Sequence, residues 1–165
     1  MKDLRAFSSL CLIVGSFLSL INTSCDRNYV FQKMEKIEGK TWNARDTVTI
    51  DFKVTDTSSP HNFYLKVRNN TDYPYRNLYF FLDMEFPNGK HWLDTVECRL
   101  ADGKGNWTGS GIGNIMDHSF LFIHRKRFPI TGKHRFHIVH AMRKKKLRGI
   151  VDVGLAVEKS PQKER

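Results

Sequence analysis

The sequence has 165 residues and a mass of 19.3 kDa, and its 27 Lys and Arg against 17 Asp and Glu give a net charge of +10. With 40% hydrophobic residues and 12 Phe it is too apolar for a disordered chain, and its three Cys exclude a disulfide-stapled miniprotein. This length is typical of one domain, and the excess of positive charge makes nucleic acid a partner to consider.

The first 24 residues have the features of a signal peptide. A basic start, Met1–Arg5, precedes an apolar stretch from Leu10 to Ile21. That stretch is shorter than the roughly 20 residues of a membrane-spanning helix and fits the apolar part of an export signal. Ser24 then leads into Cys25, although Asn22 stands where lipoproteins usually have Leu or Val. We expect cleavage before Cys25 and lipidation of its thiol, with acyl chains such as palmitate; a plain secretory signal is the alternative.

The remaining chain is expected to contain a tether and one domain. Residues 25–40 predict a lipidated tether that also has the composition of a first strand, and residues 41–165 predict the folded domain. Cys11 leaves with the signal and Cys25 carries lipid, so Cys98 is expected in the core as a small apolar residue. A single Cys supports neither a structural disulfide nor a Cys-based zinc site.

Strand signals dominate from Trp42 onward. Val48, Ile50, Phe52 and Val54 share one parity, as expected for a strand with one buried face. No long segment with helical periodicity is present. Short β-branched and aromatic runs separated by turn residues predict seven strands: Thr47–Val54, Phe63–Asn69, Leu78–Phe86, Trp92–Leu100, Ile115–Ile123, Arg135–Met142 and Ile150–Glu158.

The fold class that follows is all-β. The spacing of these runs predicts an antiparallel β-sandwich of about 7–8 strands, either immunoglobulin-like or a jelly roll. The segment Phe86–Lys90, with Asn-Gly at its tip, predicts a hairpin between two of the strands.

The positive charge is concentrated near the C-terminus. Residues 26–120 hold 12 Lys and Arg against 13 Asp and Glu, whereas residues 121–165 hold 13 against 3. The densest runs are Arg125-Lys126-Arg127 and Arg143–Arg148, which includes Lys144, Lys145 and Lys146; both fall at expected turns and could combine into one surface at one end of the sandwich. They are either solvated loops or a docking surface for anionic lipid or an acidic partner. Export excludes nucleic acid.

The sequence gives little support for a metal, phosphate-binding or catalytic site. In a strand, His134 and His140 face one side and His137 the other, so the three cannot converge on a metal ion. The glycine-rich segment 109–113 has no following helix, as a phosphate loop requires, and the segment 102–106 has no closing Glu, as a calcium loop requires. No nucleophile elbow or carboxylate pair stands out, so we expect no catalytic residues, no metal and no cofactor.

Several stretches together resemble the gliding-motility lipoprotein family GldH. The most specific are the loop that contains Tyr73-Pro74-Tyr75-Arg76-Asn77-Leu78 and the closing strand Gly149–Leu155. Others are Cys25 with the aromatic pair Tyr29 and Phe31, the segment Phe63–Asn69, Phe86-Pro87-Asn88-Gly89, Asp94-Thr95, the segment Leu100–Gly109 and Ala141-Met142-Arg143.

The resemblance covers most of the mature chain. It implies a non-enzymatic lipoprotein of the bacterial cell envelope, anchored to a membrane through Cys25 and associated with gliding and with the machinery around type IX secretion. Its expected partners are other envelope proteins of that machinery. The competing function is a lipid-anchored sandwich that binds glycan or another surface ligand. Tyr73, Tyr75 and Trp107 are expected either to form an aromatic surface for a partner or to cap the core.

Overall fold

The computed structural model describes residues 29–161, which are almost entirely β structure. All seven predicted runs are strands, with ends that differ by at most three residues. The strands in this range are β1 (Tyr29–Lys36), β2 (Thr41–Asn43), β3 (Val48–Val54), β4 (His61–Asn70), β5 (Asn77–Glu85), β6 (His91–Arg99), β7 (Ser110–Ile112), β8 (Ile115–Lys126), β9 (Gly132–His140), β10 (Lys146–Arg148) and β11 (Ile150–Lys159), with a short 3-10 helix η2 (Glu38–Lys40).

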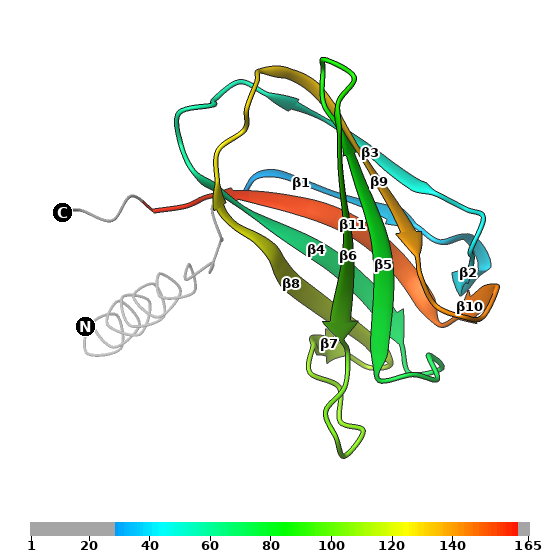
Figure 1. Ribbon diagram of the computed structural model, residues 1–165. Coiled ribbons are helices and arrows are strands. Elements are labelled where there is room, and N and C mark those ends of the chain that lie inside the picture. Colours follow the sequence, from blue (N-terminus) through cyan, green and yellow to red (C-terminus); the bar gives the residue numbers. More distant parts are fainter. Residues whose placement is uncertain (1–28, 162–165) are drawn as a thin grey trace, which may run out of the picture.

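The strands form two layers that face each other, as Figure 1 shows. One sheet has the order β1-β11-β4-β8-β7 and the other has the order β3-β9-β5-β6, and every strand pair is antiparallel. If the eight long strands are numbered along the chain, the two sheets read 1-8-3-6 and 2-7-4-5. This winding is that of a jelly roll, which decides between the two sandwich topologies that the sequence left open.

The number of strands differs from the expectation. The structure has eleven in the described range instead of seven or eight, because β2, β7 and β10 add three strands of three residues each. Three residues are too few for an alternating pattern to show in a sequence. The stretch before Trp42, which the sequence left open between a tether and a strand, forms β1 and pairs with β11.

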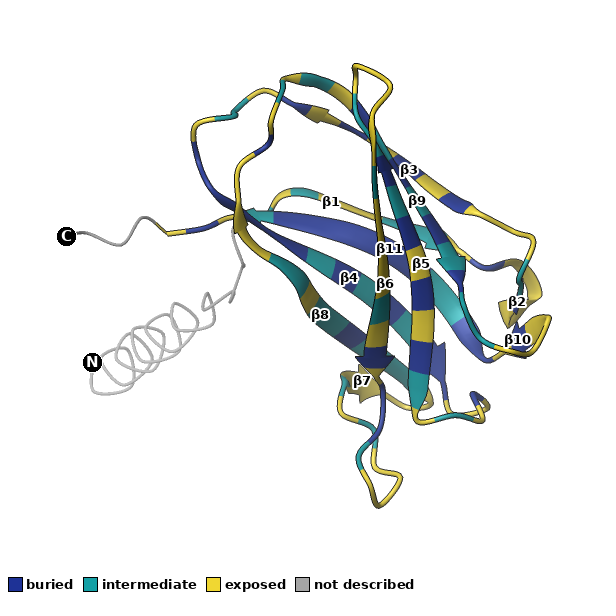
Figure 2. Ribbon diagram, in the orientation of Figure 1, coloured by how far each residue is buried: buried dark blue, intermediate teal, exposed yellow. Residues whose placement is uncertain are grey.

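The core lies between the sheets and follows from the alternation. In β3, Val48, Ile50, Phe52 and Val54 are buried while the residues between them are exposed. Figure 2 shows the same banding of buried and exposed residues along β3 and β5. The largest fully buried side chains are Trp42, Phe80 and Phe136, together with Ile50, Leu65, Leu78, Leu82, Leu100, Ile138, Leu147, Ile150 and Leu155.

Candidate membrane-facing and partner-facing ends

Strand pairing defines two ends of the five-stranded sheet. At one end, Tyr29 pairs with Glu158, and His61 pairs with both Lys126 and Lys159. We call this the N-terminal end, because the first described residue of the chain lies there. The opposite end, where Asn70 pairs with Ile115, is the far end. Strand β4 connects the two ends with ten residues, a length of about 30 Å.

The expected lipid acceptor belongs to the N-terminal end by its place in the chain. Cys25 and the expected signal peptide lie outside the described residues, which start at Tyr29. Four residues of chain reach at most about 14 Å, so the acceptor position is tied to this end of the sandwich. The far end lies about 30 Å along β4 from the end to which an anchor at Cys25 would be tied.

The two basic runs lie at opposite ends, so the expectation that they combine into one surface is wrong. Arg125-Lys126-Arg127 closes β8 at the N-terminal end, since Lys126 pairs with His61. The second run precedes β11, whose first residue Ile150 pairs with Asn69 at the far end. Both runs do fall at strand ends, as expected, but the sequence could not show which of the two ends each turn occupies.

The far-end run is held on a small ribbon. In β10, Leu147 pairs with Trp42 of β2, and both side chains are 1% exposed. The Ala44 amide also donates to the Lys145 carbonyl over 2.8 Å. These contacts fix the backbone while the side chains of residues 143–146 and Arg148 remain exposed. In the described part of the chain, none of residues 143–146 takes part in an ion pair.

The expected aromatic surface at the far end loses one of its rings. Tyr73 is 3% exposed, and its hydroxyl donates to the Asn77 carbonyl over 2.8 Å, so this side chain belongs to the core. Tyr75 packs edge-on against Tyr73 with ring centroids 5.7 Å apart, and both Tyr75 and Trp107 are partly buried against the core. The geometry of Tyr73 therefore fits the role of capping the core. Partner contact by Tyr75 and Trp107 stays a prediction.

An ion-pair network on the outer face of the five-stranded sheet has no signal in the sequence. Arg68 of β4 places Nε 2.8 Å from Asp117 Oδ1 and Nη1 3.1 Å from Asp152 Oδ2. The carboxylates come from β8 and β11, the two neighbours of β4 in the sheet. They raise the pKa of the guanidinium, chiefly through the hydrogen bond to Asp117. To predict this network one would have to know how β4 aligns with β8 and β11, and the sequence does not show that alignment.

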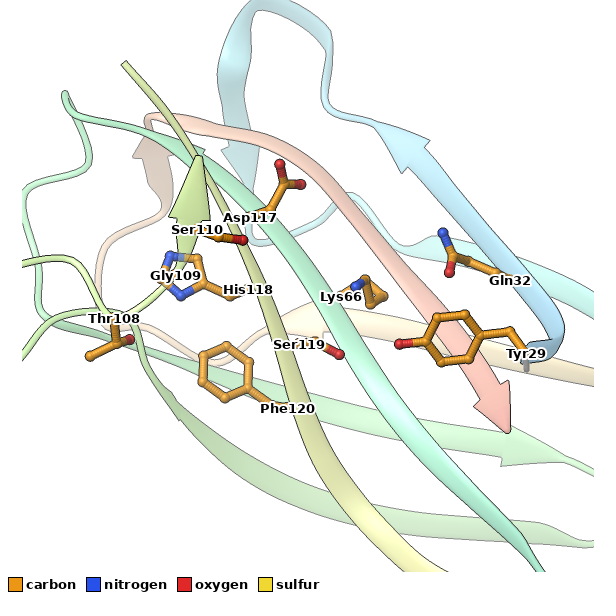
Figure 3. A pocket seen from close by; sticks show the side chains of 10 residues that line it. All are labelled: Tyr29, Gln32, Lys66, Thr108, Gly109, Ser110, Asp117, His118, Ser119 and Phe120. Carbon is orange, nitrogen blue, oxygen red and sulfur yellow. The ribbon is translucent and has the colours of Figure 1, made fainter. Parts of the chain in front are cut away.

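A shallow hollow lies on the same outer face, shown in Figure 3. Its volume is about 530 Å³, and its lining includes Tyr29, Gln32, Lys66, Asp117 and Ser119. The Lys66 ammonium lies 5.9 Å from the centroid of the Tyr29 ring. The one carboxylate of this lining, Asp117, is engaged by Arg68. The hollow therefore presents hydrogen-bonding groups without the two carboxylates that glycoside hydrolysis uses.

The histidines of β9 take the sides that their spacing predicted. His134 and His140 are buried, at 0% and 2% exposure, whereas His137 faces outward and its Nδ1 lies 3.0 Å from the Thr49 hydroxyl. Burial lowers the pKa of both His134 and His140, so they are neutral at pH 7. Over residues 29–161 no group of three or more His, Cys, Asp or Glu side chains is placed to hold a metal ion.

Cys98 lies in the core, as the sequence predicted. It is 0% exposed, and burial raises the pKa of its thiol to about 12. Thiolate is the nucleophilic form of cysteine, and at neutral pH this thiol stays protonated. Cys98 therefore acts as a packing residue.

Among the described residues, no helix has both the length and the apolar character needed to cross a bilayer.

The likeness to solved structures is weak. A GH115 4-O-methyl-α-glucuronidase with specificity for decorated arabinogalactans matches with a TM-score of 0.43 and 12% identity, over 83% of this chain and 18% of that one. The VP2 subviral particle of infectious bursal disease virus matches with a TM-score of 0.32 and 13% identity, over 77% of this chain and 30% of that one.

Sequence relatives are much closer. A gliding motility lipoprotein GldH homolog from Christiangramia forsetii is 30% identical over 160 residues, covering 93% of this chain and 98% of the relative. Gliding motility lipoprotein GldH from Flavobacterium johnsoniae is 31% identical over 142 residues, covering 82% and 87%. The family model described as GldH lipoprotein matches residues 29–157, nearly the whole described sandwich. The chain therefore belongs to the GldH lipoprotein family.

Proposed function

We propose that this lipoprotein is a non-enzymatic accessory component of gliding-motility machinery associated with type IX secretion, anchored in the cell envelope through Cys25. The two relatives named for gliding motility align with this chain over 98% and 87% of their own lengths, and this supports the same role here. The observation that carries the proposal is the separation of the two ends of the sandwich. The described chain starts at one end, to which an anchor at Cys25 would be tied, and an exposed basic run lies about 30 Å away at the other.

A non-enzymatic role is supported by what the reactive side chains do in the structure. Cys98 is buried and protonated, and Asp117 and Asp152 are bound by Arg68. The buried histidines are kept neutral by the core around them. These contacts engage the groups in stabilising the sandwich, so the domain is suited to holding and presenting a surface.

The surface that it presents is the far-end basic run. The exposed side chains of residues 143–146 rest on a backbone fixed by the buried Trp42 and Leu147, so their positive charge is held in a defined place. An acidic surface on another envelope protein is complementary to it, and such complementarity mainly accelerates association and selects the partner. The end of the sandwich to which the proposed anchor is tied lies about 30 Å away along β4.

Two experiments test the proposal. Cys25→Ser should move the protein from the membrane fraction and remove the mass of the acyl chains. Unchanged fractionation and unchanged mass would contradict anchoring at Cys25.

The second experiment tests the partner. A photo-crosslinking residue at position 145 should capture an envelope protein in living cells, and Lys144→Glu with Lys146→Glu should abolish that product. A crosslinker at the exposed Leu121, on the outer face, is the position control.

A glycan-binding module is the second candidate, and one observation favours it. Tyr79 and Phe81 of β5 are 37% and 57% exposed on the outer face of the four-stranded sheet, beside Leu93 at 71%. Two neighbouring rings on a sheet face offer a platform for a sugar ring. Titration of the protein with envelope polysaccharide should then give binding that Phe81→Ala weakens; absence of binding across the polysaccharides removes this candidate.

A further inference from the structure

The N-terminal end contains an apolar pocket between the two sheets. Its volume is about 240 Å³, below the roughly 300–1,000 Å³ of sites for whole small molecules. It is lined mainly by apolar side chains: Phe63, Met84, Phe86, Trp92, Ile123, Phe128 and Pro129. Trp92 also packs near Phe122 of β8, with ring centroids 6.3 Å apart. A pocket of this size and lining suits a segment of one hydrocarbon chain.

Positive charge stands at the mouth of this pocket. Lys126 and Arg127 line it, and Arg125 is exposed beside them. The side chain of Arg127 is oriented by a hydrogen bond from Nε to the Ser58 carbonyl over 2.7 Å, and that of Arg125 by one from Nη1 to the Pro161 carbonyl over 3.1 Å. Both acceptors are neutral, so these bonds position the guanidinium groups without cancelling their charge.

An irregularity in the pairing of β4 with β8 sets the direction of the side chains of Arg125, Lys126 and Arg127. The register between β4 and β8 shifts between His61 and Phe63, and Arg125 has a positive φ of 51°. The Arg125 amide donates to the Asn62 side chain over 3.0 Å, which holds the bulge. Bulges bend a strand and change the direction of its side chains. Here the bend places three consecutive basic residues at the end of β8.

The acidic groups nearby are engaged elsewhere. Asp56 accepts from Ser58 and pairs with Lys159 at 3.2 Å, and Glu158 accepts from the Tyr64 hydroxyl. Among the described residues, Arg125, Lys126 and Arg127 take part in no ion pair. The charge of the three-residue run is therefore available to an external anion.

The lipid anchor decides which anion this end meets. Only four residues of chain separate Tyr29 from Cys25, so an anchor at Cys25 holds the N-terminal end within about 14 Å of the membrane surface. The far-end basic run lies about 30 Å from this end along β4. An amphiphile that has an anionic head and a hydrocarbon tail matches the pairing of a basic rim with an apolar pocket.

We propose that the N-terminal end docks on anionic phospholipid of the membrane that holds the anchor. Arg125, Lys126 and Arg127 contact the headgroup phosphates, and the pocket takes a segment of one acyl chain. The docked sandwich stands upright, with its far-end basic run directed away from the bilayer. This inference rests on the anchor at Cys25 in the proposed function.

Tryptophan fluorescence tests it on the acylated protein. The protein is reconstituted in vesicles of phosphatidylcholine with brominated acyl chains, with or without anionic phosphatidylglycerol. Trp92 lines the pocket, whereas Trp42 and Trp107 belong to the far end. Anionic vesicles should quench the emission, Trp92→Phe should remove the quenched component, and neutral vesicles should leave it unquenched.

Charge reversal completes the test. Lys126→Glu with Arg127→Glu should abolish quenching in anionic vesicles, whereas Lys144→Glu with Lys145→Glu at the far end should leave it intact. Equal quenching in neutral vesicles, or quenching that survives the first pair, would overturn the docking. Unquenched Trp92 in anionic vesicles would overturn it too, including the case in which the protein's own acyl chain fills the pocket. Mass spectrometry of the same sample reads acylation of Cys25 separately: unacylated protein contradicts the anchor, and acylated protein without quenching contradicts the docking alone.

Discussion

The Tyr73 hydroxyl donates a hydrogen bond to the Asn77 carbonyl over 2.8 Å from a side chain that is 3% exposed. This bond fixes the connection between β4 and β5 against the core, because it ties the middle of the connection to the first residue of β5. Burial raises the pKa of the Tyr73 hydroxyl well above its usual range, so it remains a donor at every pH of interest. The connection is thus an ordered part of the domain.

Removal of that hydroxyl should therefore affect stability. Tyr73→Phe keeps the ring and leaves the Asn77 carbonyl without its partner, which should lower the free energy of unfolding by about 1 kcal/mol. Chemical denaturation measures the change. Tyr75→Phe is the control, because it removes a hydroxyl from a neighbouring, partly buried ring and leaves the bond from Tyr73 to Asn77 in place. Crosslinking to the partner should be unaffected. A stable Tyr73→Phe variant that loses partner capture would return this residue to the binding surface.

Gly149 is expected to be highly sensitive to substitution. Its φ is +87°, a conformation that L residues rarely adopt, and an added Cβ would lie 2.5 Å from the Tyr73 amide nitrogen. Gly149→Ala should lower the free energy of unfolding by about 2 kcal/mol or more, because strain and a steric clash combine. Gly103→Ala is the matched control, since nothing lies within 4 Å of its added Cβ. Equal stability of the two variants would contradict this account.

The sequence contained most of the fold. Alternation in Val48–Val54 and the Asn-Gly turn at Asn88-Gly89 identified strands and a hairpin because these signals are local. The choice of jelly roll over immunoglobulin-like topology was beyond it, since strand order depends on contacts between distant segments. The short strands β2 and β10 exist because Trp42 and Leu147 pair across more than 100 residues of chain.

The candidate sites could be predicted only in part. The residues of the two basic runs were identified from composition, but their separation follows from the register of β4 with β8 and β11. The sequence left Tyr73 open between a partner surface and a cap on the core, because it lies in a polar loop beside Pro74. Its burial depends on the neighbouring Gly149, which the sequence does not place next to it.

Arg68 should hold its sheet together electrostatically. Arg68→Met leaves Asp117 and Asp152 as uncompensated carboxylates, and Asp152 is only 16% exposed, so the free energy of unfolding should fall by about 1–2 kcal/mol. The loss should shrink in high salt, because screening weakens carboxylate repulsion. Denaturation at low and high salt measures it. Lys133→Met is the control: its partner Asp51 keeps Arg135 at 2.9 Å, so a loss as large as that of Arg68→Met would contradict the argument.

Cys98 should resist thiol reagents in the folded protein. Its thiol is fully buried with a pKa of about 12, so almost no thiolate exists at pH 8. A maleimide should therefore react with a variant that carries Cys11→Ser and Cys25→Ser, which leaves Cys98 as its one cysteine, only as fast as the sandwich opens. Denaturant should accelerate the reaction by orders of magnitude. Cys98→Ala in the same background is the control for reaction at other groups. Rapid labelling in native buffer would show that Cys98 is accessible.

Stability should fall as the pH falls through the range of histidine titration. Burial is the largest cause that lowers the pKa of four histidines, His61, His118, His134 and His140. Each then binds a proton more readily in the unfolded chain, whose histidines titrate near pH 6.5. The unfolded state therefore holds more protons below that pH, and the free energy of unfolding falls by up to about 1.4 kcal/mol per pH unit for each histidine.

Carboxylates act in a different window. Hydrogen bonds hold the pKa of Asp51, Asp56, Glu97 and Asp102 below their usual values, so their stabilisation is lost only in more acidic solution, below about pH 4.5. Denaturation curves from pH 7.5 to pH 5 thus isolate the histidines. His134→Phe, within reach of Phe52, Phe86 and Phe128, should make the pH dependence shallower, whereas His124→Gln at an exposed position should not. A flat profile for the unmodified protein over this range would show that the buried histidines accept protons without unfolding.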